Sequence, residues 1–325
     1  REMQNLRYRR DDRLPHGNGY GSGILFRQGE SVMNNFVLTC GSTADLGVEY
    51  AKERDIAVLP FKFMLGDIDH LDDGKEISNT KVYEILSKGV VGKTSQVTSS
   101  EYEEFFTPYL EKGLDVIHVT LSSGLSGTYE SCLTAKKNLE EKFPQRKVYV
   151  IDSLSGSMGQ GMIVTTVADL RDQGLSAEEI VTKVEEEKLN FNALYFAPDL
   201  STFIRGGRLS AAAGFVGTIL KIVPLLTVDA AGKLVVKKKL IGKRRATAEL
   251  VSEMVKTADG GKNYSGECVV CHANALEDAK ITVSEIEKEM PALAGKIKIS
   301  EIGATMGCHC GPGTIAVFYI GEKRI

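Results

Sequence analysis

The sequence lacks several features that would assign the chain to a specialised class of protein. Its six cysteines are too few for a disulfide scaffold in 325 residues, which favours a reducing, cytoplasmic location. No hydrophobic run approaches the roughly 18 residues needed to span a bilayer, so stable membrane insertion is not expected. The net charge of −3 argues against general nucleic-acid binding. With 42% hydrophobic residues, the composition is that of a soluble globular protein with room for two domains.

The first 32 residues differ from the rest of the chain. They are rich in Arg, Gly and Asp, show no hydrophobic periodicity and lack the apolar segment of a signal peptide. Met33 then leads directly into an apolar strand. We therefore expect residues 1–32 to be a disordered leader that is absent from the native protein, which would begin at Met33.

Strand and helix patterns alternate through the first half of the chain. Strands are expected at 36–40, 55–63, 115–120 and 147–151, and helices at 44–54, 79–88, 100–112, 126–142 and 158–172. This alternation is typical of an α/β fold with a parallel sheet covered by helices on both faces. We assign this part to an N-terminal domain at 33–180.

The second half contains hairpin signals, including the turn Asp229-Ala230-Ala231-Gly232. Strands are expected at 192–198, 223–228, 233–241, 267–273, 296–302 and 313–320, and helices at 200–205, 245–258 and 276–289. The pattern predicts a mixed or antiparallel sheet with helices on one face, in a C-terminal domain at 181–325. The join is expected near 174–190, where the charged run 185–188 should be solvated.

A hydroxyl-rich segment at 121–128 is the most informative local feature. It follows the apolar run 114–120 and precedes a helix, and it contains Ser122, Ser123, Ser126 and Thr128 together with two glycines. Unpaired N–H groups and the helix dipole make such a helix start a ready anion site. Because Ser and Thr are also favoured as N-caps, an ordinary cap remains the alternative. A second polar cluster, Thr94-Ser95-Gln96, lies upstream.

Six motifs occur in an order and at spacings that resemble the DegV family of bacterial fatty-acid-binding proteins. They are Leu38-Thr39-Cys40-Gly41-Ser42-Thr43-Ala44-Asp45-Leu46, Thr94-Ser95-Gln96, Ser122-Ser123-Gly124-Leu125-Ser126-Gly127-Thr128, Ile151-Asp152-Ser153, Gly206-Gly207-Arg208-Leu209 and Gly307-Cys308-His309. The resemblance extends from about residue 34 to the C-terminus. It implies a two-domain protein that holds a long-chain fatty acid between its domains. It also implies that a separate kinase subunit receives the acyl carboxylate and makes an acyl-phosphate, so the chain itself would be no enzyme and need no cofactor.

The resemblance also implies roles for individual residues. The carboxylate would be held by Thr94 or Ser95 together with Ser122 or Ser123. His309 matches the family position near the carboxylate. Arg208 would lie at the ligand mouth and serve the complex with the kinase; a surface Arg with its stem packed down is the alternative.

The segment 211–222 is almost wholly apolar. A helix that is apolar on every side is either buried or faces a lipid-like ligand. The resemblance favours an acyl tunnel lined by four of its residues: Phe215, Val216, Ile219 and Leu220. A plain core helix is the alternative from the residues alone.

Two other functions stay open at this stage. A serine hydrolase or acyltransferase could use Ser123 or Ser126, and the candidate bases are His118 and His309. A nucleic-acid-binding or regulatory protein could use a basic stretch over 237–245.

Two local features bear on the site in other ways. The CxxC pair Cys268 and Cys271 suggests zinc, but it reads as a buried strand whose residues three apart face opposite sides, so no metal is expected. In the first motif the family usually carries Asp where this chain has Gly41, which puts the order of that loop in question.

Overall fold

The structure is a computed structural model that describes residues 35–209 and 222–325. The expected leader at 1–32 lies outside the described residues. So do the four residues expected to line an acyl tunnel: Phe215, Val216, Ile219 and Leu220. Within the described ranges, no helix is long and apolar enough to cross a membrane.

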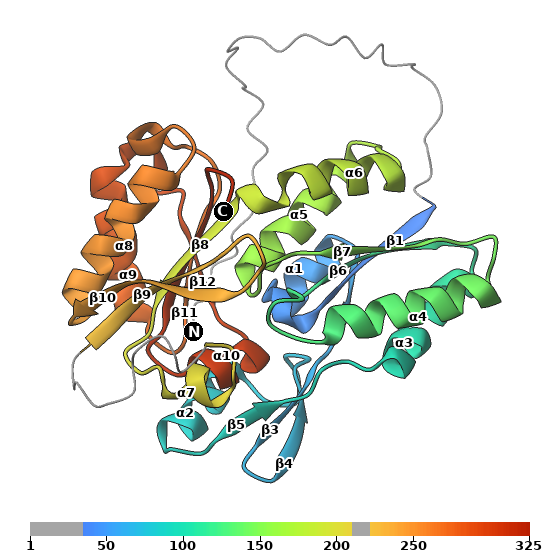
Figure 1. Cartoon of the computed structure of the whole chain (residues 1–325), viewed down its shortest axis with the longest axis horizontal. Coiled ribbons are helices and arrows are strands. Elements are labelled where there is room, and N and C mark those ends of the chain that lie inside the picture. Colours follow the sequence, from blue (N-terminus) through green and yellow to red (C-terminus); the bar gives the residue numbers. More distant parts are fainter. Residues whose placement is uncertain (1–34, 210–221) are drawn as a thin grey trace, which may run out of the picture. The chain divides into compact units, whose positions relative to one another are not determined.

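The first sheet confirms the predicted parallel sheet of an α/β fold (Figure 1). Its strand order is β2 (Ile56–Leu59), β1 (Phe36–Gly41), β6 (Asp115–Thr120) and β7 (Val148–Asp152), and each adjacent pair is parallel. One face packs on α3 (Ser99–Glu111) and α4 (Thr128–Lys142), and the other on α5 (Met158–Asp172) with its neighbour α6 (Ala177–Glu187). Side chains alternate accordingly along β6: Val116 faces α3 and α4, whereas Ile117 and Val119 face α5.

The second sheet confirms the predicted mixed sheet. Its strand order is β10 (Leu234–Ile241), β9 (Ile222–Val228), β8 (Phe191–Phe196), β13 (Ile315–Ile320), β11 (Cys268–His272) and β12 (Lys298–Glu301). The pair β11–β12 is parallel and the others are antiparallel. Helices α8 (Lys243–Thr257) and α9 (Leu276–Glu289) cover one face. The opposite face packs on α5, which is therefore buried between the two large sheets.

A third sheet, three-stranded and antiparallel, was not predicted. The expected strand 55–63 is divided at Pro60 and Phe61 into β2 and β3 (Lys62–Leu65), because proline has no N–H to continue a ladder. Strand β3 pairs with β4 (Ile68–Leu71) and β5 (Gly92–Thr94), and α2 (Asn79–Ser87) connects these two. This small sheet places Thr94 at the end of β5.

One other prediction in this half needs correction. The helix expected at 44–54 is a short turn, η1 (Ser42–Ala44), followed by α1 (Val48–Glu53), because Asp45 (φ 53°) and Gly47 (φ 77°) interrupt it. The expected join at 174–190 contains the helix α6, which begins with a capping box between Ser176 and Glu179. The proposed boundary between residues 180 and 181 therefore falls inside a helix.

The C-terminal half contains one helix that the sequence pattern did not predict, α10 (Ala304–Cys310). It follows β12, lies beside α7 (Ser201–Arg205), and contacts β5 of the small sheet. The remaining elements of ranges 35–209 and 222–325 are short turns: η2 (Lys188–Asn190), η4 (Gly261–Asn263) and η5 (Pro291–Leu293). As expected, Cys268 and Cys271 lie on the buried strand β11.

Candidate ligand-binding cavity

A mainly apolar cavity lies where the loops of the first sheet meet the inner face of the second sheet and α10. Its empty space, which includes a part open to solvent, is about 870 Å³. The second sheet contributes apolar and aromatic walls: Ala193, Tyr195, Val228, Leu234, Ala316 and Phe318. The loops after β6 and β7 contribute Leu121, Leu125 and Gly156. The loops lie at the carboxyl ends of parallel strands, where α/β proteins commonly bind ligands.

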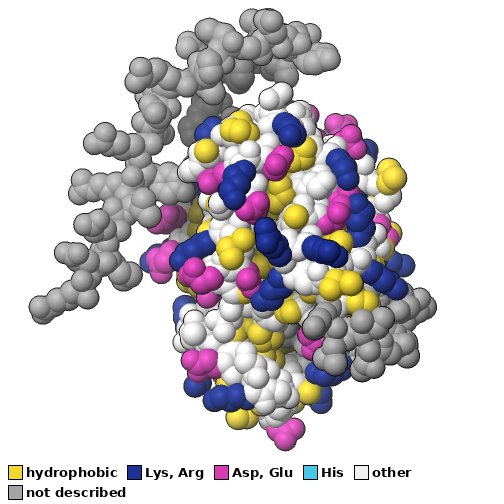
Figure 2. All heavy atoms as spheres, turned by 90° about the vertical axis from the view of Figure 1, so that its left-hand side faces the viewer, with side chains coloured by type: hydrophobic (Ala, Val, Ile, Leu, Met, Phe, Trp, Pro, Cys, Tyr) yellow, Lys and Arg dark blue, Asp and Glu magenta, His cyan; other side chains and the backbone are white. Residues whose placement is uncertain are grey.

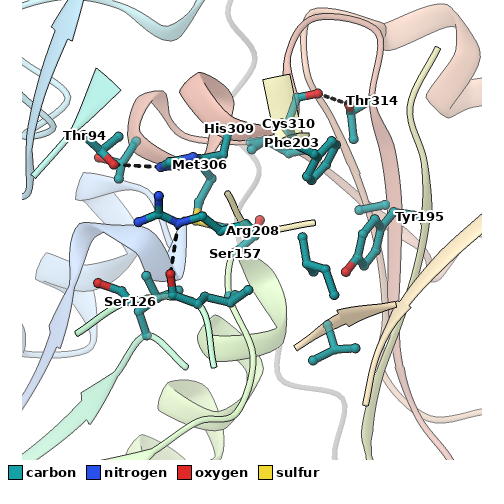
Figure 3. A pocket seen from close by; sticks show the side chains of 18 of the residues that line it. Thr94, Ser126, Ser157, Tyr195, Phe203, Arg208, Met306, His309, Cys310 and Thr314 are labelled. Atoms are coloured by element: carbon teal, nitrogen blue, oxygen red, sulfur yellow. Dashed lines mark hydrogen bonds between the residues drawn. The ribbon is translucent and has the colours of Figure 1, made fainter. Parts of the chain in front are cut away.

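Polar side chains gather at one part of this cavity (Figure 3). Thr94 Oγ1 lies 2.7 Å from His309 Nε2, so a hydrogen bond joins the end of β5 to α10. A Cβ added to Gly206, the C-cap of α7, would lie 2.6 Å from His309 Nδ1. The absence of a side chain at Gly206 therefore lets the imidazole approach the backbone of α7.

Arg208 completes the polar cluster. Its Nε donates to the carbonyl of Leu125 at 3.0 Å and its Nη1 donates to the carbonyl of Gly206. These bonds hold the guanidinium beside His309 and Thr94, as Figure 3 shows. Burial, and secondarily the charge of Arg208, lower the pKa of His309 to about 4. At neutral pH the imidazole is therefore uncharged, and Arg208 is the cation of the cluster.

Two serines of the hydroxyl-rich segment 121–128 form hydrogen bonds within the protein. Ser122 is buried; its Oγ donates to the carbonyl of Gly232 at 2.8 Å and accepts from the N–H of Gly124 at 3.0 Å. The N–H of Ser123 donates to Asp152 Oδ1 at 3.1 Å. Neither serine lines the cavity. Both belong to the turn that leads from β6 into α4.

Ser126 reaches the cavity from the same segment, although the resemblance assigns the carboxylate to Ser122 or Ser123. Its Oγ lies 2.8 Å from Thr128 Oγ1 and accepts from the Thr128 N–H at 3.2 Å. The N-cap of α4, Gly127, has no side-chain cap. The position of Ser126 in the sequence is the signal that could have identified it, because Ser126 is the serine next to the start of α4.

The structure brings together Thr94, Ser95, Arg208 and His309 around the cavity, with Ser126 as a further member. Gln96 lines the same region and was noticed in the sequence only as a neighbour of Thr94. No side chain among these described residues forms a serine–histidine pair, since Ser126 bonds to Thr128 and His309 to Thr94.

His118, the other candidate base, lies away from the cavity. It is fully buried on β6, where Nδ1 lies 2.8 Å from Thr39 Oγ1 and the ring packs edge-on against Tyr102 and Phe106 of α3. Burial lowers its pKa to about 3. His118 is therefore a neutral core histidine.

The loop that carries Gly41 is anchored without an acid at that position. Ser42 Oγ accepts from the N–H of Phe61 at 3.0 Å, and Thr43 Oγ1 donates to Gln160 of α5 at 2.9 Å. A Cβ at Gly41 would lie 2.7 Å from the ring of Phe61, which lines the cavity. The missing side chain therefore leaves room for Phe61.

Acidic side chains of α8 and α9 neutralise much of the basic stretch at 237–245. Glu253 pairs with Lys237 at 3.1 Å and with Lys238 at 3.2 Å, and Lys243 pairs with Asp278 at 2.5 Å. Figure 2, which faces this side of the molecule, shows Lys and Arg side chains interleaved with Asp and Glu. Such a surface does not present the continuous positive charge that nucleic-acid binding requires.

Comparison with known proteins identifies relatives that match most of the chain. A family model described as "Uncharacterised protein, DegV family" matches residues 36–322. A DegV domain-containing protein of Clostridium perfringens is 32% identical over 293 residues, which cover 90% of this chain and 99% of that protein.

Two solved structures are similar over almost their full length. One is a DegV lipid-binding protein from Thermotoga maritima, with 25% identity, a TM-score of 0.76, and coverage of 90% of this chain and 100% of that one. The other is DegV, a fatty-acid-binding protein from Bacillus subtilis, with 28% identity, a TM-score of 0.75, and coverage of 89% and 100%. The chain belongs to the DegV family.

Proposed function

We propose that this protein binds a long-chain fatty acid in the cavity and presents its carboxylate to a separate kinase subunit. The observation that carries the proposal is a largely apolar cavity in which Thr94, Ser126, Arg208 and His309 gather at one part. An acyl chain matches the apolar walls and a carboxylate matches the polar cluster. The fatty-acid binding named for the Bacillus subtilis relative supports the same ligand class.

The two parts of such a ligand contribute differently to affinity. About fifteen buried methylenes at about 0.8 kcal/mol each give about 12 kcal/mol before the cost of immobilisation. Each hydrogen bond to the carboxylate adds about 1.5–3 kcal/mol. The apolar walls therefore supply most of the affinity, and the polar cluster fixes which end of the ligand lies there. Arg208 supplies the opposite charge.

The role we infer is that of a carrier. A hydroxyl nucleophile needs a base within hydrogen-bond reach, and Ser126 and His309 are each bonded to a different threonine. Phosphoryl transfer needs a nucleotide site, which the partner kinase would supply. We place this activity in the cytoplasm, where the free thiols of the described cysteines would stay reduced.

The first experiment is native mass spectrometry of the full chain expressed in bacteria, followed by extraction and identification of the lipid. We expect one fatty acid per chain, and its loss in a Thr94→Ala/His309→Ala double variant. Ser201→Ala, at an exposed position at the start of α7, is a matched control that should keep the ligand. A folded protein that is empty and takes up no added fatty acid would refute the proposal.

The kinase role has its own test. With a fatty acid kinase subunit and ATP, the loaded protein should yield an acyl-phosphate. Arg208→Ala should reduce acyl-phosphate formation more than it reduces fatty-acid retention. Turnover of an acyl ester without ATP would instead support the hydrolase alternative.

A further inference from the structure

Thr305 carries a buried hydroxyl that the proposed function leaves unused. The residue is 3% exposed and lines the cavity, and its Oγ1 has no hydrogen-bond partner among the described residues. A buried hydroxyl without a partner costs free energy, so natural structures usually satisfy it with protein, water or ligand.

Helix α10 places Thr305 on the side of the helix that lines the cavity. Four of its residues line the cavity with the i, i+1, i+4, i+5 spacing of one helix face: Thr305, Met306, His309 and Cys310. The opposite face packs on the protein, since a Cβ at Gly307 would lie 2.6 Å from Tyr83 Oη. Thr305 therefore lies one helical turn from His309, on the same side.

Thr305 contrasts with three other hydroxyls of the lining. Ser157 donates to Asp45 Oδ2 at 2.5 Å, Thr314 to the carbonyl of Cys310 at 2.9 Å, and Tyr195 to the carbonyl of Thr227 at 3.2 Å. Each donates its proton within the protein.

We propose that the preferred ligand is a fatty acid with a hydroxyl substituent near its carboxyl end, and that Thr305 is the residue that selects it. This inference rests on the proposed function, because it assumes that the carboxylate lies at His309 and Thr94. With the carboxylate there, the neighbouring turn of α10 faces the carboxyl-proximal part of the chain. A hydroxyl on that part can either donate to Thr305 Oγ1 or accept its proton.

The test compares palmitate, β-hydroxypalmitate and ω-hydroxypalmitate by competitive displacement from the full chain and from Thr305→Val, a substitution that keeps the shape and removes the hydroxyl. We expect the full chain to prefer β-hydroxypalmitate over palmitate by about tenfold, the effect of one hydrogen bond. Thr305→Val should abolish this preference. ω-Hydroxypalmitate should gain nothing over palmitate in either protein.

Thr314→Val is the matched control, since that hydroxyl lines the same cavity but is bonded to Cys310. It should leave the ratio of the two affinities unchanged. A ratio that is the same in the full chain and in Thr305→Val, with all three acids bound, would overturn this inference alone. Binding of none of the acids would overturn the proposed function, and this inference with it.

Discussion

The segment 121–128 and helix α10 contribute to the same cavity in opposite ways. The segment is conspicuous in the sequence, but Ser122 and Ser123 stabilise the chain's own turn and only Ser126 lines the cavity as a polar group. Helix α10 has no such signature, and it supplies His309 and Thr305. The number of hydroxyls in a segment is therefore a poor measure of how many of them line the cavity. A side chain that already bonds to the backbone, as Ser122 does, is held away from the cavity lining.

The difference has a physical origin. Segment 121–128 must turn a strand into a helix while touching the hairpin between β9 and β10, so its small polar residues satisfy backbone groups there. Helix α10 is instead stabilised by a residue that is distant in the sequence. Its N-cap, Gly303, has no side-chain cap, and Asp72 at the end of β4 accepts from the N–H of Thr305 at 3.3 Å. Side chains of α10 therefore line the cavity.

The largest expected effect tests the structural role of segment 121–128. A Cβ at Gly124 would lie 2.6 Å from the carbonyl oxygen of Ala231, which is backbone and cannot rotate away. Gly124→Ala should therefore lower the free energy of unfolding by about 3 kcal/mol, measured by urea denaturation. Gly127→Ala is the control, because its Cβ would meet the flexible side chain of Gln96 at 2.6 Å. Equal losses in both variants would contradict the tight contact between segment and hairpin.

A second prediction separates the two uses of serine within the segment. Ser126→Ala should weaken fatty-acid binding about tenfold, because it removes a hydroxyl from the polar cluster. Ser122→Ala should leave binding unchanged and lower the free energy of unfolding by about 1–2 kcal/mol, since a buried carbonyl and an N–H lose their partner. Calorimetric titration and urea denaturation of both variants would check this. The reverse pattern would restore Ser122 as a ligand residue.

Much of the fold could be predicted because its long elements have strong patterns. The bounds of β6, α5 and α9 agree with the predicted ranges 115–120, 158–172 and 276–289. Helix α10 could not be predicted in this way. It has seven residues, contains Gly307 and lacks a capping side chain of its own. It forms because Asp72 and Tyr83, from far along the chain, support it.

The site could be predicted only in part, because some of its contacts join residues that are far apart in the sequence. Thr94, Arg208 and His309 were identified through motifs, and the structure gathers them around the cavity. The choice between Ser122 and Ser126 depends on Gly232, which lies 110 residues from Ser122 in the sequence. A local pattern cannot show which hydroxyl a distant carbonyl will occupy.

A third prediction concerns the external support of α10. Asp72→Ala removes the acceptor for the N–H of Thr305, so it should lower the free energy of unfolding by about 1 kcal/mol. It should also weaken fatty-acid binding severalfold by displacing His309. Asp69→Ala, at an exposed position on the same strand, is the control for lost charge. In a double variant with His309→Ala, the binding losses should be less than additive. Full additivity would mean that Asp72 acts on stability alone.

The smallest expected effect distinguishes His309 from His118 by pH. Burial lowers both pKa values below the ordinary 6.5, to about 4 and about 3, so each histidine stabilises the fold fully above pH 6.5 and progressively less as the pH falls. Between pH 7 and pH 6, protonation of each histidine in the unfolded state should lower the free energy of unfolding by about 0.7 kcal/mol. A bound carboxylate favours the imidazolium, so loading with fatty acid should raise the pKa of His309 and leave that of His118 unchanged. NMR titration of the two imidazoles, with and without fatty acid, measures this directly. If loading shifts both pKa values equally, or shifts only that of His118, the carboxylate does not lie beside α10.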